Sequence, residues 1–311
     1  MTDISKEILD KWQIRKTKKQ KTDFISFLET KLGKDNVHVE TGKSFGSRNI
    51  IIGNTDISNV DYVVCAHYDT QPVLPFPNFL APKNMIAYIL YMTILTLVML
   101  GISIGSSIAV IKLGGTIQLA NLAYYAVLFI FVGIMMFGPA NKHTANDNTS
   151  GVITVLDAYQ DSTIRDSGKV AFVLFDHEEV GLIGSSNYAS MHKKEIKNQV
   201  VINIDCIGDG SAIMFILSKH LEKEKDKANM IREALRNISA KDTTKEILVE
   251  SAKSTFYPSD QLNFKKNIAL AAFNKNKIFG YYLDKVHTSK DTVCDYKNIE
   301  IAIHGIKNLI N

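Results

Sequence analysis

Two adjacent carboxylates, Glu178 and Glu179, follow an apolar run and precede a glycine. The run over residues 169–175 is predicted as a buried strand, which places the acidic pair at its carboxyl end. Open α/β sheets carry their chemistry at that edge. Neighbouring residues that leave a strand point in different directions, so one carboxylate could bind a metal while the other moves a proton. A Glu-Glu pair alone is also common at a solvated helix start, so further ligands have to converge on it.

More acidic and histidine residues occur at other predicted strand ends and loops. They are His67, Asp69, Asp147, Asp205 and His287. Each has an ordinary alternative, such as a buried histidine, a helix N-cap at Asp147 or a turn at Asp205. Together, imidazole and carboxylate ligands in this mixture suit zinc. A shared aspartate, with one carboxylate and one histidine on each side, would hold two metal ions about 3.5–4 Å apart.

The elements that would position these residues alternate between strands and helices. We predict strands over residues 37–39, 49–52, 62–70, 169–175, 200–205, 212–217, 247–249 and 268–273. We predict helices over residues 4–32, 182–195, 219–237 and from 298 onward, and a loop that enters a helix over 146–161. This order predicts an α/β fold with a mixed, largely parallel sheet that helices flank on both faces.

Two long stretches contain no Asp, Glu, Lys or Arg. They cover residues 85–111 and 119–138, which are 27 and 20 residues long. At about 1.5 Å per residue, each is long enough to cross a hydrocarbon core of about 30 Å, whereas two such runs fit a buried hairpin in a soluble protein poorly. The link between them is short and holds Lys112, so we predict a transmembrane hairpin with both outer ends on one side. Gly101 and Gly105 form a Gly-xxx-Gly pattern suited to helix packing within the hairpin or in a homo-oligomer.

The hairpin divides the chain into three parts. Residues 1–84 hold the N-terminal helix and the first part of a soluble domain, residues 85–138 the inserted hairpin, and residues 139–311 the remainder of that domain. The N-terminus is polar and has no apolar signal core, and the three widely spaced cysteines do not form a disulfide framework. We therefore expect an integral membrane protein with two transmembrane helices and a cytoplasmic soluble domain.

Composition excludes some classes of protein. The 311 residues are 46% hydrophobic, which excludes a disordered or fibrous chain. The net charge is a modest +4, and no region combines basic with aromatic residues as nucleic-acid-binding surfaces do, so nucleic acid is not an expected partner. One basic cluster lies in the predicted N-terminal helix: Lys11, Arg15, Lys16, Lys18, Lys19 and Lys21. A solvated helix face and a surface attracted to anionic lipid are the two interpretations.

Five motifs occur in the order found in a known enzyme family. They are Ala66-His67-Tyr68-Asp69-Thr70, Ala145-Asn146-Asp147-Asn148-Thr149-Ser150-Gly151, Glu178-Glu179-Val180-Gly181-Leu182-Ile183-Gly184-Ser185, Asn203-Ile204-Asp205 and His287-Thr288-Ser289-Lys290-Asp291-Thr292. A weaker sixth is Ser259-Asp260-Gln261-Leu262-Asn263-Phe264. From about residue 60 onward, the chain resembles the di-zinc aminopeptidases of the bacterial leucyl aminopeptidase and aminopeptidase Y type, which implies their zinc-exopeptidase fold.

The resemblance implies a role for each matching residue. Asp147 would bridge two zinc ions. His67 and Asp205 would complete the first ion, and Glu179 and His287 the second.

The remaining acidic residues would act beside the metals. Glu178 would be the general base, because zinc lowers the pKa of bound water to about 7 and a neighbouring carboxylate can accept the proton. Asp69, two residues beyond His67 and so on the same strand face, is expected to hold the other nitrogen of that imidazole. Asp291 would do the same near His287.

The sequence departs from the family pattern in two places. The predicted hairpin occupies a connection that is normally short, and Gln261 stands where the sixth motif usually has histidine. Cys65 and Cys206 lie beside ligand motifs, and we expect both to be small buried residues, with Cys206 facing away from Asp205.

The leading hypothesis is a membrane-anchored zinc aminopeptidase that removes N-terminal residues from apolar or membrane-associated peptides. A glutaminyl-cyclase-like transferase with one catalytic zinc on the same fold is the first alternative. A non-catalytic receptor or scaffold is the second, and it would be expected to lack ligands. A related acylamino-acid amidohydrolase usually carries a different motif around the bridging aspartate.

Overall fold

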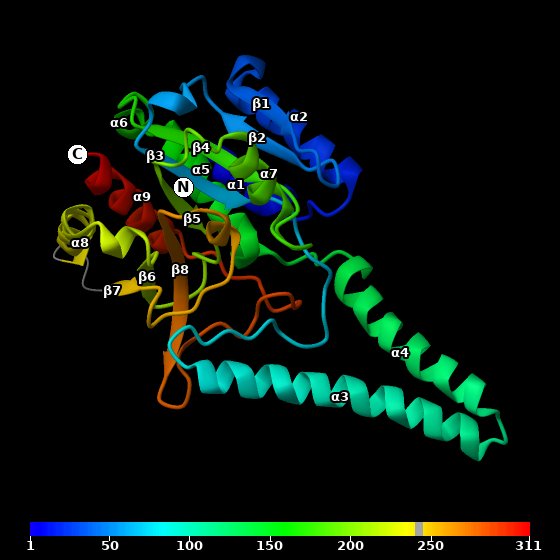
Figure 1. Ribbon diagram of the computed structural model, residues 1–311. Helices are drawn as coiled ribbons and strands as arrows, with labels where there is room; N and C mark the ends of the chain where they lie inside the picture. The colour runs from blue at the N-terminus through cyan, green and yellow to red at the C-terminus, as the bar shows by residue number, and fades with distance from the viewer. Residues whose placement is uncertain (240–244) are drawn as a thin grey trace.

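A sheet of nine strands forms the centre of the part of the chain that the computed structural model describes, residues 1–239 and 245–311 (Figure 1). The strands are β1 (Val37–Thr41), β2 (Arg48–Ile52), β3 (Tyr62–His67), β4 (Val170–Phe175), β5 (Val200–Ile204), β6 (Ala212–Leu217), β7 (Glu246–Ser251), β8 (Asn267–Asn276) and β9 (Gly280–Tyr282). Their order is β1-β2-β4-β3-β5-β8-β6-β7, with β9 beside β8. The predicted mixed α/β sheet is confirmed.

The middle of the sheet is parallel. β3 pairs in parallel with both β4 and β5, and β5 pairs in parallel with β8. Every residue of β3, β4 and β5 is buried. Strands buried on both faces are made of continuous apolar runs, which is why these three could be recognised in the sequence.

Helices cover both faces of this sheet. One face packs against α1 (Asp3–Lys11), α2 (Lys18–Leu32), α5 (Gly151–Gln160), α8 (Lys225–Ser239) and α9 (Tyr296–Ile310). The short helix α6 (Ser162–Arg165) follows α5 on the same side. The other face packs against α7 (Ile183–Met191) and against loops.

The N-terminal helix differs from the prediction. A single helix over residues 4–32 is wrong, because the chain forms α1 and α2 with a break between them. Thr17 caps α2: its hydroxyl accepts the N–H of Gln20, and the Gln20 side chain accepts the N–H of Thr17. This capping box starts a new helix where the apolar spacing suggested a continuous one.

Other boundaries differ as well, and the predicted helix over 182–195 ends at Met191. The predicted helix over 219–237 is a short 3₁₀ turn, Leu221–Lys223, followed by α8, and the predicted strand over 62–70 ends at His67. The strand β9 was not predicted, because three residues are too few to show a periodic pattern.

Two long apolar helices project from the body of the molecule (Figure 1). They are α3 (Met85–Lys112) and α4 (Ile117–Phe137). Both are long and apolar enough to cross a membrane. Among their residues only Ser103 and Ala120 are buried, so they are not core helices of the described body.

The two glycines of the Gly-xxx-Gly pattern do not contribute to packing within the hairpin. A Cβ built on Gly101 or Gly105 would meet no atom within 4 Å. The prediction that this pattern packs the two helices of the hairpin against each other is therefore wrong.

Candidate metal centre

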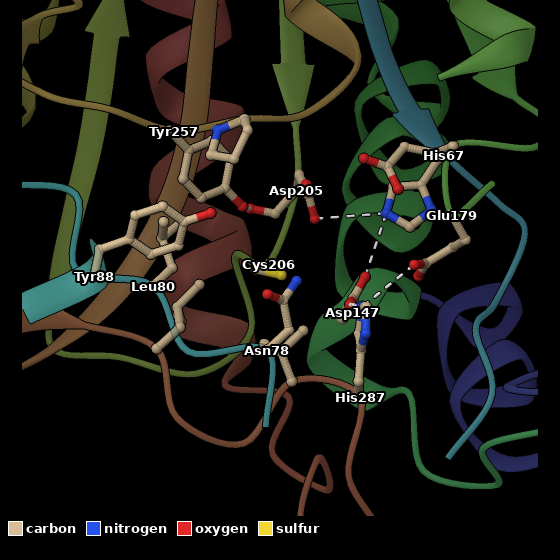
Figure 2. Close-up of a pocket in the computed structure, with 14 residues that line it drawn as sticks. His67, Asn78, Leu80, Tyr88, Asp147, Glu179, Asp205, Cys206, Tyr257 and His287 are labelled. Atoms are coloured by element: carbon tan, nitrogen blue, oxygen red, sulfur yellow. Dashed lines mark hydrogen bonds and ion pairs between the residues drawn. The ribbon is translucent and has the colours of Figure 1, made fainter. Parts of the chain in front are cut away.

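The predicted site residues lie together at the carboxyl end of the parallel strands (Figure 2). His67 is the last residue of β3, the Glu178-Glu179 pair follows β4, and Asp205 follows β5. Because these strands are parallel neighbours, their carboxyl ends meet at one edge of the sheet. Asp147 reaches the same place from the irregular segment before α5, and His287 reaches it from the loop after β9.

Asp147 stands between the two histidines and presents one oxygen to each. Its Oδ1 lies 3.3 Å from His67 Nε2, and its Oδ2 lies 3.2 Å from His287 Nε2. On the first side, His67 Nε2 is 3.6 Å from Asp205 Oδ1. On the second side, His287 Nε2 is 3.2 Å from Glu179 Oε2. The five residues therefore form two groups that share one carboxylate.

Each group has the composition of a metal site. The ligand atoms lie within 4.8 Å of one another in the group of His67, Asp147 and Asp205, and again in the group of Asp147, Glu179 and His287. His67 Nε2, Glu179 Oε1 and Asp205 Oδ1 are buried and have no hydrogen-bond partner among the described residues. Buried polar atoms normally find partners, and carboxylate with imidazole is a zinc ligand set, so these residues fit zinc.

Glu178 lies beside these groups and lines a cavity that opens next to them. Its carboxylate, His67 and Glu179 form a third set of atoms within 4.8 Å. The side chain makes no hydrogen bond or ion pair with the described residues. Burial raises the pKa of Glu178 well above its usual range, and the charge of Glu179 adds to the rise.

Asp69 has a different position from the predicted one. β3 ends at His67, so Asp69 does not continue that strand face, and His67 Nδ1 lies nearer to the Asp69 carbonyl oxygen (3.1 Å) than to its carboxylate (3.7 Å). The carboxylate accepts the N–H of Glu178 at 3.0 Å and of Glu179 at 3.3 Å. Burial alone would raise the pKa of Asp69, but His67 and Lys21 outweigh it and hold that pKa at about 2. Asp69 thus connects the histidine to the acidic pair.

The expectation for Asp291 is wrong. Its carboxylate accepts the N–H of Asn146 at 2.8 Å and of Asp147 at 2.9 Å, and it makes no hydrogen bond to His287. It fixes the backbone of the shared aspartate. No local pattern shows this contact, because 144 residues separate Asp291 from Asp147.

Two members of the N-terminal basic cluster belong to the surroundings of the site. Arg15 is 0% exposed and Lys21 is 3% exposed, so neither a solvated face nor a lipid surface describes them. Sequence reasoning missed both, although each carries a positive charge near the carboxylates. Cations surrounded by helix-forming polar residues give no sign of burial in the sequence.

A cavity of about 240 Å³ opens beside the two groups. Beyond the candidate ligands and Glu178, its wall includes Leu283 and Val286. It also includes Leu80, Tyr88 and Tyr257, which Figure 2 labels. Cys206 also lines this cavity, because β5 ends at Ile204 and strand alternation no longer applies to residue 206. The expectation that Cys206 faces away is therefore wrong, whereas Cys65 and Cys206 are both buried as expected.

Comparison with known proteins adds an independent finding. A family model described as peptidase family M28 matches residues 131–307, which is more than half of the chain. The chain belongs to peptidase family M28. Comparison of this M28 chain with curated protein sequences gives no match.

Solved structures with the same fold include two kinds of enzyme. A Zn-dependent exopeptidase from Parabacteroides distasonis is 14% identical, with a TM-score of 0.59, and the match covers 99% of this chain and 94% of that one. The LapA aminopeptidase of Legionella pneumophila is 12% identical, with a TM-score of 0.55 and coverages of 100% and 68%. A glutaminyl cyclase from Tannerella forsythia is 13% identical, with a TM-score of 0.59 and coverages of 99% and 97%. At these identities the similarity shows the fold, which is that of zinc exopeptidases.

Proposed function

We propose that this M28 chain is an aminopeptidase that uses two zinc ions. The observation that carries the proposal is the shared carboxylate of Asp147, whose two oxygens face His67 and His287 at 3.3 and 3.2 Å. Asp205 would complete one ion and Glu179 the other. A carboxylate between two sets of ligands is the arrangement that a two-metal hydrolase needs.

Bound zinc would polarise the scissile carbonyl and lower the pKa of a water molecule at the site. Glu178 lies in the cavity with a carboxylate that makes no hydrogen bond to the described residues. It would accept a proton from water as the water oxygen attacks the carbonyl carbon, and would deliver that proton to the leaving nitrogen as the C–N bond breaks. Asp69 would keep Glu178 in place through the backbone N–H that it accepts.

The proposed location is a membrane, with α3 and α4 crossing it and the remainder of the chain in the cytoplasm. The support is the exposure of two apolar helices of 28 and 21 residues, whose one charged residue is Lys112 at the end of α3. Apolar surface of that extent is unfavourable in water and favourable in lipid.

The proposed substrates are apolar or membrane-associated peptides. Tyr88, in the first turn of α3, and Leu80, in the segment leading to it, both line the cavity. Their apolar surfaces lie opposite the candidate metal ligands, as Figure 2 shows for Tyr88 and Asp147. A peptide with an apolar N-terminal side chain would bury that side chain against this wall.

The test is metal analysis and peptide turnover of the wild type beside Glu178→Gln. We expect the variant to retain close to two zinc ions per chain and to lose about 100- to 10 000-fold in kcat, because the amide cannot accept a proton. Glu233→Gln, an exposed change on α8, is the matched control. Turnover within a few-fold of the wild type would exclude Glu178 as the base, and loss of zinc would make it a ligand instead.

A glutaminyl-cyclase-like transferase is the second candidate, because a glutaminyl cyclase has the same fold at a TM-score of 0.59. The presence of two complete ligand groups favours the peptidase. Release of ammonia from a peptide with N-terminal glutamine would support the cyclase. Release of free amino acids from other peptides would support the aminopeptidase.

A further inference from the structure

The segment that joins α1 to α2 and begins α2, residues 12–21, contacts three of the chain segments that carry the candidate ligands. Arg15 and Lys21 are its two buried cations. The M28 family model matches residues 131–307, so this segment lies outside the matched region.

Arg15 joins the segment of His67 and Asp69 to the segment of Asp147. Its Nε donates to the carbonyl oxygen of Tyr68 at 2.5 Å. Tyr68 stands between His67 and Asp69 in the chain. One terminal nitrogen donates to Thr149 Oγ1 at 3.2 Å, two residues after Asp147. The same nitrogen donates to the carbonyl of Trp12, which ties the guanidinium to its own segment.

Backbone contacts of the same segment support this connection. The N–H of Arg15 donates to Thr70 Oγ1 at 3.0 Å. Thr144, three residues before Asp147, donates its hydroxyl to the Gln13 carbonyl at 2.6 Å and its N–H to the Gln13 side chain at 3.0 Å. Residues 13–15 thus hold the chain on both sides of Asp147.

Lys21 reaches the third segment. Its Nζ forms a buried ion pair with Asp176, two residues before Glu178. The Asp176 carboxylate also accepts the N–H of His177 and the N–H of Arg48, both at 2.9 Å. A buried carboxylate that lost its cation would leave this arrangement with an uncompensated charge.

We propose that Arg15 and Lys21 are positioning residues, which hold the segments of His67, Asp147 and Glu178 in register so that the metal groups are assembled before zinc binds. Within the described part of the chain, neither side chain makes a hydrogen bond or ion pair with a candidate ligand atom, so they act through the backbone and through Thr149 and Asp176. The inference concerns the metal centre and applies whether that centre cleaves peptides or cyclises glutamine.

The test measures zinc affinity by competition with a chromophoric chelator, together with kcat and KM, for Arg15→Met and Arg15→Lys. We expect Arg15→Met to weaken zinc binding by about 10- to 100-fold and to lower kcat of the zinc-saturated enzyme more than KM changes. Arg15→Lys retains the charge but cannot reach Tyr68 and Thr149 together, so it should fall between Arg15→Met and the wild type.

Lys21 is tested with the double variant Lys21→Met and Asp176→Asn, which removes both charges of the buried ion pair. We expect this double variant to bind zinc more weakly than the wild type, with a smaller loss than Arg15→Met. Arg165→Met is the matched control, because the partly exposed Arg165 guanidinium, on α6, donates to Asp166 and not to the segment 12–21. That variant should bind zinc as the wild type does.

Two results would overturn the proposal. Tighter zinc binding by Arg15→Met would mean that Arg15 acts only through its positive charge, which opposes cation binding. A lowered melting temperature of the metal-free protein, with wild-type zinc affinity and kcat in the folded fraction, would mean that it acts only on folding.

Discussion

Acidic residues at this centre differ in pKa because their neighbours differ. Burial raises the pKa of Glu179 to about 7 and that of Asp291 to about 8. Burial would also raise the pKa of Asp147, but His287 and His67 outweigh it and hold this pKa below its usual range. At the level of single residues, a carboxylate between two imidazoles stays ionised, as a shared ligand has to.

A residue far from the centre gives a prediction for pH. His192 Nε2 lies 2.7 Å from Glu40 Oε2, and this hydrogen bond raises the pKa of His192, with Glu195 adding to the effect. A raised folded pKa stabilises the protein fully below the unfolded value of about 6.5, and the stabilisation is lost as pH rises through the folded value. His192→Gln should therefore lower the melting temperature more at pH 5.5 than at pH 8.5.

The control for this pH prediction is His38→Gln. His38 Nε2 contacts the neutral amide of Asn54 at 2.8 Å and faces no carboxylate in that contact. Thermal unfolding at both pH values measures the difference for each variant. An equal loss for His192→Gln at both pH values would contradict the role assigned to Glu40.

The sequence motifs named seven candidate site residues, which lie together in the structure, but gave no sign of the residues that support them. His67, Glu178 and Asp205 could be found because each stands at the end of a continuous apolar run. Asp291 and Arg15 act over separations of 144 and 134 residues, and such contacts depend on the finished fold. No local pattern in the sequence encodes them.

Among the elements, the parallel strands and the two apolar helices were predictable, and the break before α2 was not recognised. The apolar residues of α1 and α2 continue at helical spacing across the break, whereas the capping residues Thr17 and Gln20 mark it. Burial of both faces makes a strand conspicuous in the sequence, and helix ends depend on one or two polar residues.

The hairpin of α3 and α4 leads to a prediction about topology. In cells expressing the chain with Cys294→Ser, a membrane-impermeant maleimide should label Leu113→Cys, in the turn between the helices, from outside. Lys43→Cys, in an exposed loop of the body, should be labelled only after lysis. Labelling of both positions from the same side would contradict a hairpin that crosses the membrane.

In the whole molecule, the hairpin is attached directly to the cavity. The segment 71–84, which leads into α3, runs along the loop that carries His287. Leu74 donates its N–H to the His287 carbonyl at 2.7 Å, and Asn78 donates to the Val286 carbonyl at 3.0 Å. Lys16, from the segment 12–21, donates to the Met136 carbonyl in the last turn of α4 at 3.0 Å. The cavity therefore lies at the base of the two helices.

This placement predicts a preference among substrates. The enzyme in lipid vesicles should cleave amphipathic peptides with large apolar N-terminal residues faster than small soluble aminoacyl compounds. Tyr88→Ala should lower kcat/KM about 10-fold or more for a bulky apolar N-terminal residue and only a few-fold for alanine, because it removes cavity wall. Equal cleavage of soluble and amphipathic substrates by detergent-solubilised enzyme would contradict a preference for membrane peptides.

The central strand β3 precedes the hairpin in the chain, and both of its neighbours, β4 and β5, follow it. A ribosome therefore completes His67 first, then the 28 and 21 residues of α3 and α4, and only afterwards the other candidate ligands. Domains fold as their parts emerge, so β3 has to wait without partners while the hairpin is made. The centre can form only after the hairpin has left the ribosome, so under the proposed function the chain would meet a membrane before it could hydrolyse a peptide.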